Sequence, residues 1–173
     1  MLTSTSAHLS VVQPHRPDAP LIPGLTATRR LTSVETGSIS IVEHVFSPGA
    51  LVPPHRHTLE DEISYVVSGE IGFRSDGKEV SLAAGGYIVK PRGELHSMWN
   101  AGGTPARMIE IISPAGFEKY FVELAEAVAA AGGLPDPSTM GAIAGPFGLS
   151  FDLSEVPDLV ARHGLLSPGG RPR

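Results

Sequence analysis

Turn-forming residues divide residues 26–113 into short apolar runs. Glycine and proline occur 20 and 16 times in the 173-residue chain, well above their usual frequency. Residues 39–46 alternate with period two, the repeat of a strand, and end at Ser47, Pro48 and Gly49. Similar runs with nearby turn signals cover residues 63–67, 71–74, 80–82, 87–89, 95–99 and 107–112. This spacing predicts about eight short strands in an antiparallel sandwich or barrel.

The pattern changes to a helical one after Pro114. Apolar residues from Phe117 to Val128 recur at the spacing of one helix face, and Gly132 ends the run. A shorter helix is expected at residues 154–163, with Ser154 as N-cap and Gly164 as C-cap. The chain therefore divides into an extended N-terminal arm (1–24), a β-barrel (25–113), a C-terminal helical segment (114–166) and a disordered tail (167–173).

Composition excludes several classes of function. The absence of cysteine excludes disulfides, thiolate metal sites and cysteine nucleophiles. A net charge of −5 argues against nucleic acid as the main partner, because binding to phosphates needs a basic excess. No apolar run approaches the roughly 18 residues of a membrane span, and the N-terminus has no basic, apolar leader pattern. We therefore expect a cytoplasmic protein without membrane partners.

Three histidines and one glutamate have the spacing of a metal site. His55 and His57 are two residues apart, so both side chains leave the same face of an extended chain. Glu62 opens the next strand, and His96 lies on a strand further along. If these strands are neighbours, three imidazoles and one carboxylate converge, a donor set that suits a borderline divalent metal. Such a centre carries a net charge of about +1, which favours an anionic oxygen ligand.

The residues around these ligands form two recognisable motifs. The first reads Gly49, five residues, His55-Arg56-His57, four residues, Glu62, six residues and Gly69. The second reads Gly85, five residues, Pro91-Arg92-Gly93, two residues, His96, three residues and Asn100. Both resemble the motifs of the cupin superfamily. The residues after them resemble the ending of small single-barrel bacterial cupins that are often described as similar to quercetin 2,3-dioxygenase.

The resemblance implies an all-β fold, a single antiparallel jelly-roll barrel (the double-stranded β-helix of cupins) with one or two C-terminal helices. It also implies a homodimer and one divalent metal per chain, held by His55, His57, Glu62 and His96. The metal would be Fe, Mn, Ni, Co, Cu or Zn. Glu60 and Asp61 compete with Glu62 as the carboxylate ligand. The family interval selects Glu62, and Glu60 is then expected to face solvent.

Other side chains receive more ordinary interpretations. Val66 and Met98 are expected to fill the barrel, and Trp99 to pack away from the metal. Lys90 is expected at the surface, as isolated basic residues on strands usually are, with binding of an acidic group at the barrel rim as the alternative. Phe117, Tyr120 and Phe121 either pack the helix against the barrel or hold an apolar substrate under a helical lid.

The reaction stays open between three hypotheses. The first is a metal-dependent, dioxygenase-type oxidoreductase acting on a small organic substrate that chelates through adjacent oxygens in a mainly apolar pocket. Glu62 would then serve as a ligand and also as a catalytic base. The second is a redox-silent isomerase, cyclase, lyase or decarboxylase that uses the metal as a Lewis acid. The third is a non-catalytic cupin that binds a small molecule.

Overall fold

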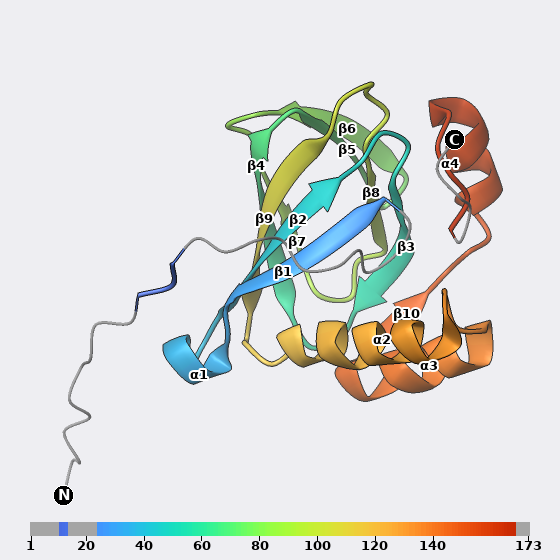
Figure 1. The fold of residues 1–173 in the computed structure, drawn as a ribbon. Helices are drawn as coiled ribbons and strands as arrows, with labels where there is room; N and C mark the ends of the chain where they lie inside the picture. The colour runs from blue at the N-terminus through green and yellow to red at the C-terminus, as the bar shows by residue number, and fades with distance from the viewer. Residues whose placement is uncertain (1–10, 14–23, 169–173) are drawn as a thin grey trace, which may run out of the picture.

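The computed structural model describes residues 11–13 and 24–168 (Figure 1). The predicted arm at 1–24 and tail at 167–173 therefore lie almost entirely outside the described residues. None of the helices in the described part of the chain is long and apolar enough to cross a membrane.

Two five-stranded antiparallel sheets face each other and form the barrel (Figure 1). The first sheet contains, in order, β1 (Leu25–Leu31), β2 (Ser40–Phe46), β9 (Ala106–Ser113), β4 (Asp61–Ser68) and β7 (Tyr87–Lys90). The second contains β10 (Leu149–Phe151), β3 (Leu51–His57), β8 (His96–Trp99), β5 (Glu70–Ser75) and β6 (Lys78–Ala83). The prediction of an all-β antiparallel jelly roll is confirmed.

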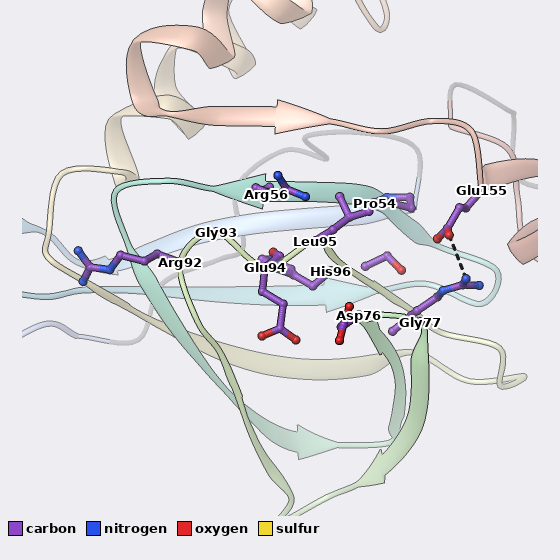
Figure 2. A pocket seen from close by; sticks show the side chains of 12 residues that line it. Pro54, Arg56, Asp76, Gly77, Arg92, Gly93, Glu94, Leu95, His96 and Glu155 are labelled. Atoms are coloured by element: carbon purple, nitrogen blue, oxygen red, sulfur yellow. Dashed lines mark hydrogen bonds and ion pairs between the residues drawn. The ribbon is translucent and has the colours of Figure 1, made fainter.

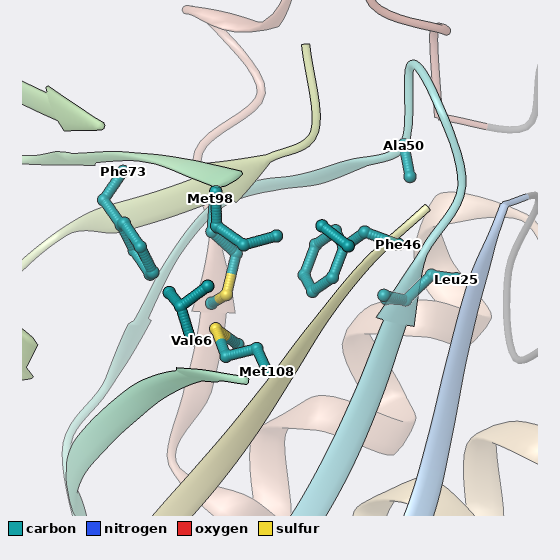
Figure 3. Close-up of a cluster of buried hydrophobic side chains, with 9 residues drawn as sticks. Leu25, Phe46, Ala50, Val66, Phe73, Met98 and Met108 are labelled. Atoms are coloured by element: carbon teal, nitrogen blue, oxygen red, sulfur yellow. The ribbon is translucent and has the colours of Figure 1, made fainter. Parts of the chain in front are cut away.

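The interior of the barrel is apolar at one end. Alternation along each strand directs every second side chain inward, and these side chains form a cluster separate from the one that packs against α2 (Figure 3). The cluster contains Leu25, Phe46, Ala50, Val66, Ile71, Phe73, Met98, Ala106 and Met108. Val66 and Met98 fill the barrel as predicted.

Trp99 packs on the outer side of the second sheet, away from the metal-ligand candidates as predicted. It lies in a separate apolar cluster with Leu51, Leu159 and Leu165. Its ring lies against Gly72 of β5, where an added Cβ would stand 2.3 Å from the indole Nε1. Only glycine allows this close approach between the two strands.

The C-terminal region holds more helix than predicted. The first predicted helix is α2 (Glu118–Ala131), and the second is α4 (Val156–His163). Ser154 does not cap α4, because Glu155 holds the N-cap position and the Ser154 N–H donates to Asp152 Oδ1. The described residues also contain α1 (Ser33–Thr36), α3 (Pro137–Ala144) and the 3₁₀-helix η1 (Gly145–Phe147), which the sequence reading missed. α2 and α3 lie together across one end of the barrel, and α4 lies at its side (Figure 1).

Candidate metal centre

His55, His57, Glu62 and His96 come together at the end of the barrel nearest α2. Each offers one ligand atom, and these four atoms lie within 4.8 Å of one another. All four residues are buried, with exposed fractions of 5% or less. The arrangement can hold one metal ion.

The sheet register explains this convergence. His55 on β3 pairs directly with His96 on β8, and their ring centroids are 4.3 Å apart. His57 follows two residues later on the same face of β3. Glu62 opens β4 in the opposite sheet, with its Oε1 3.4 Å from His57 Nε2 and its Oε2 3.2 Å from His96 Nε2. The site therefore joins the two sheets.

The hydrogen bonds of the histidines leave ligand atoms free. His55 Nδ1 lies 2.8 Å from the Pro53 carbonyl, and His96 Nδ1 lies 3.0 Å from the Glu94 carbonyl. A carbonyl oxygen only accepts, so each Nδ1 carries the hydrogen and each Nε2 keeps its lone pair. Among the described residues, the buried His96 Nε2 has no hydrogen-bond partner, and the buried Glu62 Oε2 has none besides its ion pair with Lys90. Buried polar atoms without partners are costly, and a bound cation would satisfy both.

The electrostatics favour the protonation states that metal ligands need. Burial, together with the neighbouring His96 and His57, lowers the pKa of His55 well below its usual value. Burial also lowers the pKa of His96. For Glu62 burial opposes the charge, but the nearby Lys90 and His57 prevail and hold its pKa well below the ordinary value. Neutral imidazoles and an ionised carboxylate are the ligand forms that bind a metal.

A buried lysine lies beside the cluster, and the prediction that Lys90 sits at the surface is wrong. Lys90 is 1% exposed, with its Nζ 3.0 Å from Glu62 Oε2 and 2.9 Å from Glu110 Oε2. Ser64 Oγ donates to Glu110 Oε1 at 2.8 Å. Burial outweighs the effect of Lys90 on Glu110 and raises its pKa to about 7. The inner wall of the first sheet is thus partly ionic, where a mainly apolar pocket was expected.

The alternation of side chains along β9 indicates that Glu110 is buried. Met108 and Ile112 on β9 are fully buried, and Glu110 lies between them on the same face. Lys90 lies opposite Glu62 in the β4–β7 register. The first relation was visible in the sequence, whereas the second requires the strand pairing.

Glu60 is buried as well, so the expectation that it faces solvent is wrong. It is 5% exposed, and its Oε2 lies 3.5 Å from His57 Nδ1. Neither atom has a hydrogen-bond partner in the part of the chain that the structure describes. Glu60 therefore faces the Nδ1 side of the His57 ring and is not one of the four clustered residues.

Aromatic side chains cover the cluster. The Phe117 ring lies 4.4 Å from the His57 ring, edge to face, and the Phe151 ring lies 6.0 Å from that of His55. Phe117 also stacks on Tyr120 at 5.1 Å and contacts Phe121. The start of α2 thus both packs on the barrel and shields the histidines from that end.

A charged surface cavity of about 630 Å³ lies beside His96 (Figure 2). Arg56, Arg92, Asp76 and Glu94 line it, and Arg74 pairs with Glu155 across 3.0 Å at one side. Arg56 is exposed, because its side chain leaves β3 on the face opposite to that of His55 and His57.

The comparisons with known proteins match the barrel region of the chain. Residues 42–112 match the family model of the cupin domain. TcmJ, a tetracenomycin polyketide synthase protein of Streptomyces glaucescens, is 34% identical over 86 residues, which cover 49% of this chain and 58% of that protein. An oxalate-binding protein of Thermotoga maritima is 38% identical over 65 residues, covering 38% of this chain and 54% of that protein. The chain thus spans less than two thirds of either relative.

A solved structure has the same fold. The crystal structure of a predicted oxalate decarboxylase from Thermotoga maritima aligns with a TM-score of 0.55 and 26% identity. The alignment covers 61% of this chain and 99% of that one.

Proposed function

We propose, taking the cupin-domain match of residues 42–112 as the premise, that this chain is a metal-dependent oxidoreductase of dioxygenase type. Its substrate is a small organic molecule that binds through adjacent oxygens. His55, His57, Glu62 and His96 would hold one divalent metal. A redox-active ion there would supply Lewis acidity and reactivity toward O₂. A dioxygenase places both oxygen atoms in the product, so no separate reductant is needed.

The observation that carries this proposal is the donor set itself. Three neutral imidazoles and one carboxylate leave a dication with a net charge of about +1, which favours an anionic oxygen ligand. The oxalate-binding relative agrees with this preference, since oxalate offers adjacent carboxylate oxygens. Phe117 and Phe151 would exclude water from one side of the centre.

Glu62 is proposed first as a ligand. As a catalytic base it would be weak, because the ion pair with Lys90 helps to hold its pKa well below the ordinary value.

A redox-silent decarboxylase or other Lewis-acid enzyme is the second candidate. It is favoured by the likeness to the structure described as a predicted oxalate decarboxylase. A non-catalytic binding protein is the third, favoured by the oxalate-binding relative.

Elemental analysis of the purified protein beside a His96→Ala variant tests these proposals. We expect about one redox-active metal per chain in the wild type and its loss in the variant, because His96 supplies one of four ligand atoms. His163→Ala is the matched control, since His163 lies beside Trp99 and Glu79, away from the cluster. Oxygen uptake with a catechol-type diol would follow.

Zinc in the wild type would favour the Lewis-acid enzyme. A metal of either kind without turnover would favour the binding protein. Failure of the wild type to take up any added divalent metal would contradict the metal centre and all proposals built on it.

We also propose that the chain forms a homodimer in the cytoplasm and binds neither nucleic acid nor membrane. We propose the same division of the chain into a barrel (25–113) and a helical segment (114–166).

A further inference from the structure

We propose that Lys90 is a positioning residue of the metal centre, whose buried ammonium group, held by Glu110, fixes the carboxylate of Glu62 toward the three histidines. This inference rests on the proposed metal centre. It assigns a task to a charged group that is not one of the fixed positions of either motif.

Three neighbouring strands build the arrangement. Lys90 on β7 lies directly opposite Glu62 on β4, and on the other side of β4, Ser64 lies opposite Glu110 on β9. Ser64 donates to Glu110 Oε1, which leaves Glu110 Oε2 to face Lys90. The ammonium group is therefore held from both directions, 2.9 Å from one carboxylate and 3.0 Å from the other.

Burial of these three charged side chains has a high desolvation cost. The side chains of Lys90, Glu110 and Glu62 are only 1%, 2% and 5% exposed. A buried charge is tolerated only when it is paired, and an apolar pair at positions 90 and 110 would fill the same space without that cost. Packing alone thus does not explain why this wall of the barrel carries a lysine.

The contacts of Glu62 indicate what Lys90 does in this arrangement. Apart from Lys90, its partners at ion-pair distance among the described residues are His57 and His96, which are themselves candidate ligands. An imidazole that presents its Nε2 lone pair to a metal has no hydrogen there to donate to the carboxylate. Lys90 is then the group that attracts Glu62 without competing for the metal, as outer partners of metal ligands do.

The test compares metal binding by the wild type, Glu110→Gln and the double variant Lys90→Met/Glu110→Gln. A lone Lys90→Met variant would leave Glu110 buried without its cation and is expected to fold poorly. The double variant removes both charges and keeps their volumes. Co²⁺ is the probe, with its dissociation constant measured by chelator competition and its ligand geometry by the visible absorption spectrum.

We expect Glu110→Gln to bind Co²⁺ nearly as the wild type does, because Lys90 still faces Glu62. The double variant should bind roughly 10- to 100-fold more weakly and show an altered spectrum, the loss found for other outer-sphere changes. Its metal-free unfolding midpoint should fall, because Glu62 stays buried without a cation, so the spectrum of bound Co²⁺ and not the midpoint distinguishes the two roles. A purely structural role for Lys90 would change the midpoint and leave the spectrum of bound Co²⁺ unchanged.

Unchanged affinity and spectrum in the double variant would overturn the positioning role while leaving the metal centre intact. If the double variant does not fold, Lys90→Gln with Glu110→Gln supplies the same comparison with two hydrogen-bonding side chains. Absence of Co²⁺ binding by the wild type would instead refute the proposed function.

Discussion

At the scale of single residues, the Glu60 carboxylate lies beside Nδ1 of His57, while Nε2 of the same ring faces Glu62. Glu60 Oε2 lies 3.5 Å from His57 Nδ1, and both side chains are buried. If His57 binds through Nε2, Nδ1 carries the hydrogen and points at an acidic acceptor. Such pairs fix the ring and raise the basicity of the ligand.

Glu60→Gln should therefore weaken metal binding by about tenfold, with little change in size or fold. Chelator competition measures the change, and Glu126→Gln on the exposed side of α2 is the control. Equal affinities of Glu60→Gln and the wild type would mean that Glu60 does not orient His57.

The residues of the cluster differ in how far the sequence predicts them. His55 and His57 share a face because of a two-residue spacing, which is a local property of an extended chain. The burial of Lys90 depends instead on its partner across the strand pair, Glu62, and on Glu110 from a third strand. A charged side chain is buried only where its partner is also placed, so local rules assign it to the surface.

At the scale of elements, the start of α2 is tied to α1 by one carboxylate. Glu118 accepts hydrogen bonds from Ser33 N at 2.9 Å, Ser33 Oγ at 2.7 Å and Gly116 N at 2.6 Å. Burial opposes its charge, but the bonds from Ser33 and Gly116 lower its pKa to about 2. Glu118 thereby helps to hold the helix that carries Phe117 over His57.

Glu118→Gln should lower the free energy of unfolding at pH 7 by about 1 to 2 kcal/mol, because one acceptor oxygen becomes a donor facing Gly116 N–H. A lowered pKa in the folded state gives stability that is present above the unfolded value of 4.5 and is lost as the pH falls toward about 2. The difference between wild type and variant should therefore shrink over that range. Denaturant unfolding at several pH values measures it.

Exposed Glu123, on the same helix, supplies the control as Glu123→Gln. A difference that stays constant between pH 7 and pH 3 would show that the charge of Glu118 is not what stabilises this contact.

The amphipathic helices α2 and α4 were predictable, whereas α3 and β10 were not. α2 has an apolar stripe over three helical turns, and this spacing of apolar residues fits a helix and not a strand. α3 has eight residues, with Gly141 inside it and one buried residue, Ala144. The sequence does contain an N-cap signal for α3, because Asp136 directly precedes Pro137. The Asp136 carboxylate accepts hydrogen bonds from the backbone N–H groups of Ser138 and Thr139. β10 has three residues and exists because it pairs with β3, a relation that local sequence does not contain.

At the scale of the whole molecule, one outer face of the first sheet is apolar, and no element in the described part of the chain covers it. On β4 and β7, Ile63 pairs with Val89, and Tyr65 pairs with Tyr87 at a ring distance of 4.5 Å. Val89 and Tyr87 are 61% and 66% exposed. These four residues, the apolar face, point away from the interior, where Glu62 and Ser64 lie on the alternate positions of β4. Exposed apolar surface of this kind is typical of a contact between proteins.

We predict that the proposed homodimer forms through the apolar face, with a second copy of the chain as its partner. In a twofold contact the same residues of both copies meet, so one substitution enters the interface twice. Val89→Glu would then bring two buried carboxylates together without a cation. We expect the wild type to have twice the chain mass of 18.1 kDa in solution and Val89→Glu to have the mass of one chain. Light scattering coupled to size-exclusion chromatography measures both.

Val34→Glu is the matched control, because Val34 is 88% exposed on α1 and stands apart from the apolar face. It should leave the dimer intact. The monomeric Val89→Glu variant should keep its full metal content, since the side chain of Val89 points outward and the four ligand candidates lie inside the barrel. A dimer that persists in Val89→Glu would place the contact on another surface, and a monomeric wild type would contradict the homodimer itself.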